Sequence, residues 1–165
     1  MKDPAGNDEG YLRIAIPEDI PLLGSHHRKM FEEIQERTGN PVDLSAMEAL
    51  EKEYAGKLAR ELPSGICAAW VVETGNRIVS SGAVSIVSYV PVPHDLSSRI
   101  AFLHSIYTEK EFRDRHFAHR ITRAAAGYCR DHGVKRLYLF ASDAGRPVYE
   151  KAGFCPVPNT MLLLQ

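Results

Sequence analysis

A basic segment directly before an expected helix is the first feature of this sequence that could do chemistry. It spans residues 112–121 and places Arg113 and Arg115 next to a chain reversal. A β-like run at 100–108 precedes it, and an amphipathic helical pattern follows it as far as Gly133. The first four backbone N–H groups of a helix lack partners, and the helix dipole is positive at that end. The segment therefore suits an anion such as a pyrophosphate.

Other ligands for this segment have weaker support. His116 and His119 stand three residues apart, but no Cys or carboxylate at suitable spacing completes a metal site. The arginines could contact nucleic acid, yet few aromatic residues lie among them and the formal net charge of the chain is −1. We therefore expect a phosphate-bearing small molecule, and neither a metal nor nucleic acid.

A second segment, at 142–154, strengthens this interpretation, and a short helix is expected there. Ser142 is expected to cap that helix and not to act as a nucleophile, since no glycine-flanked elbow surrounds it. Cys129 falls within the preceding helix and Cys155 follows the last one, so neither resembles an activated thiol. The three widely spaced cysteines, Cys67 included, fit buried free thiols in a reducing cytoplasm.

Side-chain periodicity predicts one domain covering 11–165, preceded by a disordered tail at 1–10. The chain of 165 residues is long enough for one core and too short for two typical domains. The expected order of elements, βααββ–βαβαβ, gives an α/β or α+β sheet, and no apolar run is long enough to span a membrane. In the first helix, one ring of the adjacent His26 and His27 is expected to face the core and the other to face solvent.

Local signals predict where these elements begin and end. Asp19 is expected to cap the first helix, and Ser45 with Glu48 forms a capping-box pattern for the second. A β-hairpin is expected over 67–90. The later elements are a strand at 135–141, a helix at 143–152 and a closing strand at 161–164. The closing strand could also pair with a second subunit, which would give a homodimer.

These segments, in this order, resemble the GNAT superfamily of N-acetyltransferases over most of the chain. The family signature Gln/Arg-x-x-Gly-x-Gly/Ala maps onto 113–118, where the first and last positions match and His116 replaces the central glycine. The run 102–108 resembles the splayed strand that lies beside the pantetheine arm. The segment 142–154 resembles the last helix of the family, in which Tyr149 takes the position that faces the coenzyme sulfur.

The resemblance implies a mixed, mainly antiparallel, twisted sheet flanked by helices, with a splayed central strand. It also implies acetyl-CoA as the cosubstrate, with its pyrophosphate on backbone amides. The residues expected to contact the coenzyme are Ser105, Ile106, Tyr107, Thr108, Arg113, Asp114, Arg115, His116, Phe117, Ala118, His119, Arg120, Ser142 and Tyr149.

Acetyl transfer from a thioester to an amine needs a neutral amine, a polarised carbonyl and a proton for the departing thiolate. Tyr149 is expected to supply that proton as general acid, although packing of its ring is the structural alternative. Backbone N–H groups near 105–107 are expected to polarise the carbonyl. Candidates for the general base are His104, Glu32 and Glu33, and an amine that arrives deprotonated would need no base.

The expected function is acetyl-CoA-dependent N-acetyl transfer to a primary amine, by direct transfer in a ternary complex in the cytoplasm. A non-catalytic acyl-CoA-binding or sensing module on the same fold is the alternative. The acceptor, a small-molecule amine or a protein N-terminus, is expected between the first two helices and the loop 89–98. Glu32, Glu33 and Asp95 would favour a cationic amine there if they face inward.

Overall fold

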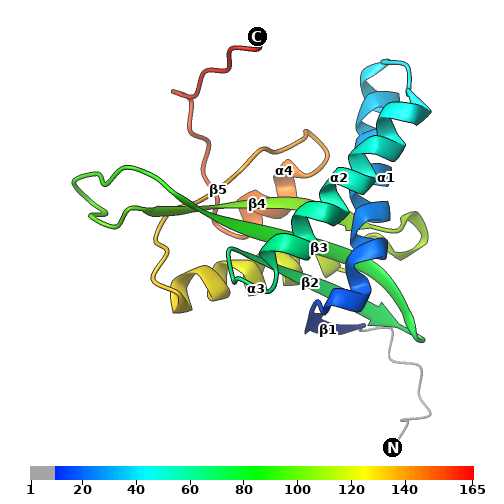
Figure 1. Ribbon diagram of the computed structural model, residues 1–165, viewed down its shortest axis with the longest axis horizontal. Coiled ribbons are helices and arrows are strands. Elements are labelled where there is room, and N and C mark those ends of the chain that lie inside the picture. Colours follow the sequence, from blue (N-terminus) through cyan, green and yellow to red (C-terminus); the bar gives the residue numbers. More distant parts are fainter. Residues whose placement is uncertain (1–9) are drawn as a thin grey trace, which may run out of the picture.

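A five-stranded sheet between two layers of helices makes up the computed structural model, which describes residues 10–165 (Figure 1). Strand order follows chain order, β1 to β5; the first four strands pair antiparallel, and β5 lies parallel to β4. The elements are β1 (Tyr11–Ile14), η1 (Pro17–Asp19), α1 (Ile20–Thr38), α2 (Leu44–Glu61), β2 (Cys67–Thr74), β3 (Arg77–Ser88), β4 (Arg99–Thr108), η2 (Lys110–Phe112), α3 (Phe117–Asp131), β5 (Leu137–Leu139) and α4 (Arg146–Lys151). The expected mixed, mainly antiparallel architecture is confirmed. Apart from Gly10, the expected tail lies outside the described residues.

Alternate side chains of β2 build two cores, one on each face of the sheet. One set packs with α1 and α2, and consists of Cys67, Ala69 and Val71. The other set packs with α3, and consists of Ala68, Trp70 and Val72. Because both faces are covered, this strand is a continuous apolar run with no polar alternation. Within residues 10–165, no helix is both long and apolar enough to cross a bilayer.

The expected hairpin is confirmed, and its turn explains the sharp reversal between β2 and β3. Gly75 and Asn76 have φ values of 53° and 65°. Positive φ at both central residues is the geometry of a tight hairpin turn whose twist matches the strands, and Gly and Asn adopt it most readily.

One expected helix start is wrong, and a second is right in position but not in its side-chain contact. The N-cap of α2 is Asp43, whose Oδ1 accepts a hydrogen bond from the Ala46 backbone N–H at 3.2 Å, so Ser45 lies inside the first turn and forms no capping box. Asp19 is the N-cap residue of α1, as expected, but its side chain makes no capping hydrogen bond to that helix. Its carboxylate turns back to accept from the Ile16 backbone N–H at 2.8 Å. Asp43 has the extended backbone of an N-cap residue, whereas Ser45 is already helical.

The C-terminal part of the chain has less regular structure than expected. β5 covers three residues of the expected strand, and α4 covers six residues of the expected helix. The expected closing strand at 161–164 is wrong: these described residues form no strand, and their side chains are 80–96% exposed. Figure 1 shows this end of the chain extending away from the sheet. An apolar run becomes a strand only when a neighbour pairs with its backbone groups.

A β-bulge in β4 lies opposite Gly82 of β3. The pairs that flank it are Ser81 with Tyr107 and Ala83 with His104. Two residues of β4, Ser105 and Ile106, therefore oppose the single Gly82, and Ser105 takes a φ of 57°. Such an extra residue interrupts the ladder and changes the direction of the strand.

The bulge also changes which side chains share a face of the sheet. Without it, His104 and Ile106 would point to the same side. With it, His104 and Tyr107 both point toward the layer of α1 and α2, where they contact Tyr54 and Glu33. Ile106 packs instead in the core beneath α3.

Beyond the bulge, β4 separates from β5. The parallel pairing ends at Leu103 and Leu139, although β4 continues to Thr108. The five residues 104–108 therefore have no partner on β5 within the described chain. The splayed strand expected from the family resemblance is confirmed.

Gly82→Ala should destabilise the protein, because the bulge leaves no room for a Cβ at this position. The added atom would overlap Ile106 Cδ1 and lie 2.8 Å from Ile121 Cγ2 in the core. We expect the free energy of unfolding, measured in urea, to fall by about 1–3 kcal/mol, as for other overpacked cores.

Gly127→Ala in α3 is the matched control. Its added Cβ would meet only Arg130 Nη2, at 3.6 Å. This variant should be stabilised by up to about 1 kcal/mol, as expected for alanine in a helix interior. Equal stability of Gly82→Ala and the wild type would contradict the close packing at the bulge.

Candidate functional site

The loop between β4 and α3 has an unusual backbone conformation. Asp114 and His116 have φ values of 63° and 62°. His116 is the N-cap residue of α3, and its side chain makes no capping hydrogen bond. Left-handed residues next to a helix start turn backbone N–H groups toward a common point, which can hold an anion.

His116 thus adopts the conformation for which glycine is favoured. Non-glycine residues pay roughly 1–2 kcal/mol to adopt left-handed geometry, and Asn, Asp and His do so more often than most. The sequence departs from the family signature at this position, but the backbone keeps the shape that a glycine would provide.

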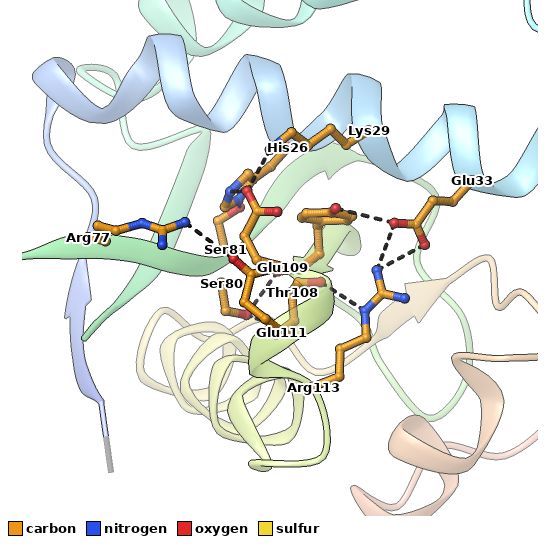
Figure 2. Close-up of polar contacts among 11 residues, drawn as sticks. His26, Lys29, Glu33, Arg77, Ser80, Ser81, Thr108, Glu109, Glu111 and Arg113 are labelled. Atoms are coloured by element: carbon orange, nitrogen blue, oxygen red, sulfur yellow. Dashed lines mark hydrogen bonds and ion pairs between the residues drawn. The ribbon is translucent and has the colours of Figure 1, made fainter. Parts of the chain in front are cut away.

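Arg113 connects this loop to α1. Its Nη2 lies 2.8 and 2.9 Å from the two carboxylate oxygens of Glu33, and its Nε donates to the Thr108 carbonyl at 3.0 Å. The Tyr107 hydroxyl donates to the same carboxylate at 3.2 Å. Figure 2 shows Arg113 reaching toward α1, where Glu33 points down to meet it. Arg113 is therefore placed to hold the loop against α1, and Glu33 already has ionic partners.

Two further arginines, one in the loop and one in the first turn of α3, pack on aromatic rings. The Arg115 guanidinium lies 5.1 Å from the centre of the Phe112 ring, and that of Arg120 lies 5.8 Å from the Phe117 ring. Arg120 also donates to the Gly10 carbonyl at 2.9 Å. Stacking of this kind fixes the plane of each guanidinium.

A polar cluster surrounds the bulge on the side of α1 and α2. The Ser105 hydroxyl lies 2.8 Å from His27 Nδ1 and 3.0 Å from His104 Nδ1. His104 continues the cluster through Nε2, which is 2.8 Å from the Ser85 hydroxyl, and the Tyr54 hydroxyl lies 3.3 Å from His104 Nδ1. The structure thus brings two of the expected residues, His104 and Ser105, into contact, and adds His27 to them.

A second group lies deeper under α1. His26 is fully buried, with Nδ1 2.8 Å from the Ser81 hydroxyl and Nε2 3.4 Å from Glu109 Oε1. Lys29 reaches the same Glu109 oxygen at 2.6 Å, as Figure 2 shows. His26 faces the core as expected, whereas the half-buried His27 also contacts the sheet, through Ser105, instead of facing only solvent.

Sequence reasoning missed His27 and Glu109 as members of this site. A usable signal was present: Ser81 and Ser85 interrupt the otherwise apolar inward face of β3, four residues apart. Buried hydroxyls need partners, so these serines predict polar side chains on the facing elements.

Burial keeps the histidines of the site neutral. It lowers the pKa of His27 and of His104 to about 4, from an ordinary value of 6.5. Burial likewise lowers the pKa of His26, against the opposing effect of Glu109. At neutral pH each of these imidazoles is therefore in its neutral form, which is the form that can act as a base.

Tyr149 lies on α4 and packs against the core beneath α3. Its ring is 6.1 Å from that of Phe154 in an edge-on arrangement, and it covers Gly145. Burial raises the pKa of its phenol, so the group is protonated at neutral pH. The helix α4 begins after its N-cap Gly145, later than expected. Ser142 Oγ nevertheless accepts from the Gly145 N–H at 3.2 Å, which is a capping hydrogen bond for the turn that leads into the helix.

An acidic depression of about 260 Å³ lies between α1 and the end of β4. Its lining residues are Lys29, Glu32, Glu33, Glu36, Tyr107, Glu109, Lys110 and Glu111. Of the three carboxylates expected to face an acceptor, Glu32 and Glu33 line this depression. Asp95 instead accepts from Arg136 Nε at 2.7 Å and holds the loop 89–98 in place.

Metal ligands and cysteine thiols are the other groups of the described residues that could do chemistry. Within residues 10–165, no group of three His, Cys, Asp or Glu side chains could hold a metal ion. Burial raises the pKa of the Cys67 and Cys129 thiols to about 11. Cys155 is exposed, so the expectation that all three cysteines are buried is wrong.

Comparison with known proteins places the chain among acetyltransferases. The model of the acetyltransferase (GNAT) family matches residues 28–154. No curated protein sequence matches the chain significantly.

Solved structures share the fold. A predicted acetyltransferase from Clostridium acetobutylicum, crystallised with acetyl-CoA, has a TM-score of 0.82 and 23% identity, over 93% of this chain and 95% of the other. A GCN5-related N-acetyltransferase from Ralstonia eutropha JMP134 has a TM-score of 0.81 and 20% identity, over 93% and 97%. The glucosamine-6-phosphate N-acetyltransferase of Arabidopsis thaliana has a TM-score of 0.60 and 16% identity, over 93% and 98%. At these identities the similarity concerns the fold.

The buried histidines should make the protein less stable in mild acid. Between pH 6.5 and 4 the unfolded chain binds protons at His26, His27 and His104, while the folded chain keeps them neutral. The free energy of unfolding should therefore fall, by about 1.4 kcal/mol per pH unit for each proton taken up. Urea unfolding at several pH values measures this slope.

His94→Asn provides the control for this experiment, because His94 is exposed. It should keep the slope of the wild type, whereas His104→Gln should reduce it. A free energy of unfolding that stays constant between pH 7 and 5 would contradict neutral burial of the three rings.

Proposed function

This chain belongs to the acetyltransferase (GNAT) family, and on that basis we propose that it transfers the acetyl group of acetyl-CoA directly to a primary amine in a ternary complex. One observation supports this most strongly: β4 separates from β5 at a bulge, and a loop with two left-handed residues follows at the start of α3. The separated part of β4 offers backbone groups that do not pair with β5 to an extended ligand. The loop offers an anion site for one end of that ligand.

The proposed coenzyme position follows from these two features. The pantetheine arm lies along residues 104–108, where β4 has no partner on β5 in the described chain. The pyrophosphate accepts hydrogen bonds from backbone N–H groups between Arg113 and Arg120. The thioester carbonyl meets a backbone N–H beside the bulge, which would stabilise the charge that develops on its oxygen.

Tyr149 is proposed to protonate the coenzyme A thiolate. Its phenol is protonated at neutral pH because burial raises its pKa, and it lies on the helix that follows the splayed strands. A phenol can donate a proton to a departing thiolate when the two are in contact.

The acceptor is proposed to be a cationic amine. The depression beside Tyr107 is lined by five glutamates against two lysines, so it attracts positive charge. Small-molecule amines and protein N-termini share this chemistry. The proposed location is a reducing cytoplasm, because the chain's three cysteines are free.

A non-catalytic acyl-CoA-binding module on the same fold is the second candidate. The left-handed His116, in place of the signature glycine, favours it, because strain at this position could weaken pyrophosphate contacts. Calorimetry with acetyl-CoA tests binding, which both candidates require. Release of coenzyme A thiol on addition of amines tests catalysis, with spermidine, an aminoglycoside, amino acids and short peptides as the panel.

Thiol release that depends on one of these amines would support the transferase. Binding of acetyl-CoA with no release above the rate in buffer would favour the binding module. Failure to bind acetyl-CoA at millimolar concentration would contradict both.

His116→Gly should bind acetyl-CoA as tightly as the wild type or more tightly. Glycine takes the observed φ of 62° without steric cost, which removes strain where the coenzyme is expected. The stability of the protein should change by less than about 1 kcal/mol, because glycine also loses more backbone entropy on folding. Calorimetry gives the dissociation constant.

The control for this variant is Asn76→Gly, which makes a comparable change at a φ of 65° in the β2–β3 turn. It should leave the dissociation constant unaltered. Binding weakened tenfold in His116→Gly alone would mean that the imidazole contacts the phosphate itself.

Tyr149→Phe removes the proposed proton donor and keeps the ring. Turnover should fall by about 10- to 1,000-fold, the effect expected from loss of a general acid, while acetyl-CoA affinity and thermal stability stay nearly constant. The loss should appear in single-turnover measurements of the chemical step.

Tyr128→Phe is the matched control, since Tyr128 lies on α3 against Trp70 and His132. It should retain wild-type turnover. Full activity of Tyr149→Phe would refute the proton-donor role, and a large loss of stability would show that the hydroxyl supports packing instead.

A further inference from the structure

Both leading candidates for the general base already have partners. The two carboxylate oxygens of Glu33 are bound by Arg113, and one also accepts from Tyr107. Both ring nitrogens of His104 lie within hydrogen-bonding distance of hydroxyl groups, those of Ser85 and Ser105. Neither group could accept a proton from an amine without breaking an existing contact.

His27 differs from them because one of its nitrogens is free. Its Nδ1 is held by the Ser105 hydroxyl at 2.8 Å, and its ring stacks on Tyr54 with the centres 3.9 Å apart and the planes 16° apart. The Phe31 ring meets it edge-on at 5.1 Å. Within residues 10–165, Nε2 of His27 has no hydrogen-bond partner. It is also not one of the fully enclosed side-chain atoms that lack a hydrogen bond, of which His26 Nε2 is an example.

We propose that His27 is the general base of the reaction: its Nε2 accepts the proton that the amine nitrogen loses as the new N–C bond forms. This inference rests on the proposed acetyl transfer. As the N–C bond forms, the C–S bond breaks, and the thiolate takes the phenolic proton of Tyr149. Solvent then takes the proton from the imidazolium and returns one to the phenolate.

Ser105 places this base beside the expected thioester. The hydroxyl that orients His27 belongs to the residue whose left-handed backbone forms the bulge. The base and the backbone groups that would polarise the carbonyl are therefore held by one residue. Catalytic bases are commonly oriented in this way: a neighbouring group, here Ser105, holds one ring nitrogen, and the other nitrogen remains available to the substrate.

The surroundings of His27 keep it in the form that accepts a proton. The titratable groups that face it are His104 on β4 and Tyr54 on α2, which burial keeps neutral, and Lys57 of α2 lowers the pKa of His104 further. Burial lowers the pKa of His27 itself to about 4. Turnover should therefore be constant near pH 7 and fall only as the medium becomes clearly acidic.

His27→Asn tests the proposal, because an amide in place of Nδ1 can still bond Ser105 while no nitrogen remains at the Nε2 position. With acetyl-CoA and the panel amine of highest turnover, kcat should fall roughly 100-fold, within the range for general base catalysis. The dissociation constant of acetyl-CoA should not change. His132→Asn, at the exposed end of α3, should keep full activity.

Chemical rescue provides a readout that a structural role would not affect. In His27→Ala, added imidazole should restore part of kcat, and the acid limb of the pH–rate profile should be absent without it. Full activity of His27→Asn, or a loss confined to acetyl-CoA binding, would overturn the role of His27 while leaving acetyl transfer intact. If the wild type releases no thiol with any amine of the panel, the proposed function and this inference both fail.

Discussion

Gly82 and the bulge opposite it are the constraint on which the site depends. Because Gly82 has no side chain, Ile106 can enter the core beneath α3, and β4 can accommodate one extra residue at Ser105. That extra residue turns the Tyr107 side chain toward α1. It also bends β4, and the pairing of β4 with β5 ends just before it. The loop that follows is then tied to the same helix by Arg113, through Glu33.

The layer between α1 and the sheet is unusually polar for a buried interface. Burying imidazole and hydroxyl groups costs free energy unless they find partners, and here most of them do. His26 bonds Ser81, while His27 and His104 share the hydroxyl of Ser105. Connected polar groups of this kind fix one geometry, since each partner restricts the next. Such rigidity suits a site that must hold a general base and backbone N–H donors in fixed positions relative to each other.

The sequence predicts the parts of this architecture that depend on local chemistry. The hairpin turn, the amphipathic α3 and the expected splayed strand follow from turn residues, periodicity and the family signature. The cap of α2 could not be predicted, because Asp43 and Ser45 are both good capping residues. The absence of a strand at 161–164 depends on pairing partners far away in the chain. The contact of His27 with Ser105 depends on the bulge, whose effect on side-chain direction no periodicity reveals.

A crystal structure of the chain with acetyl-CoA would locate the coenzyme. We expect pyrophosphate oxygens within about 3.2 Å of backbone nitrogens at the start of α3, between Arg113 and Arg120. The thioester carbonyl should lie beside the bulge of β4, on the side from which His27 Nε2 can be reached. A coenzyme that leaves the edge of β4 at 104–108 empty, or that contacts the loop through side chains alone, would show that the bulge and the loop do not form the coenzyme site.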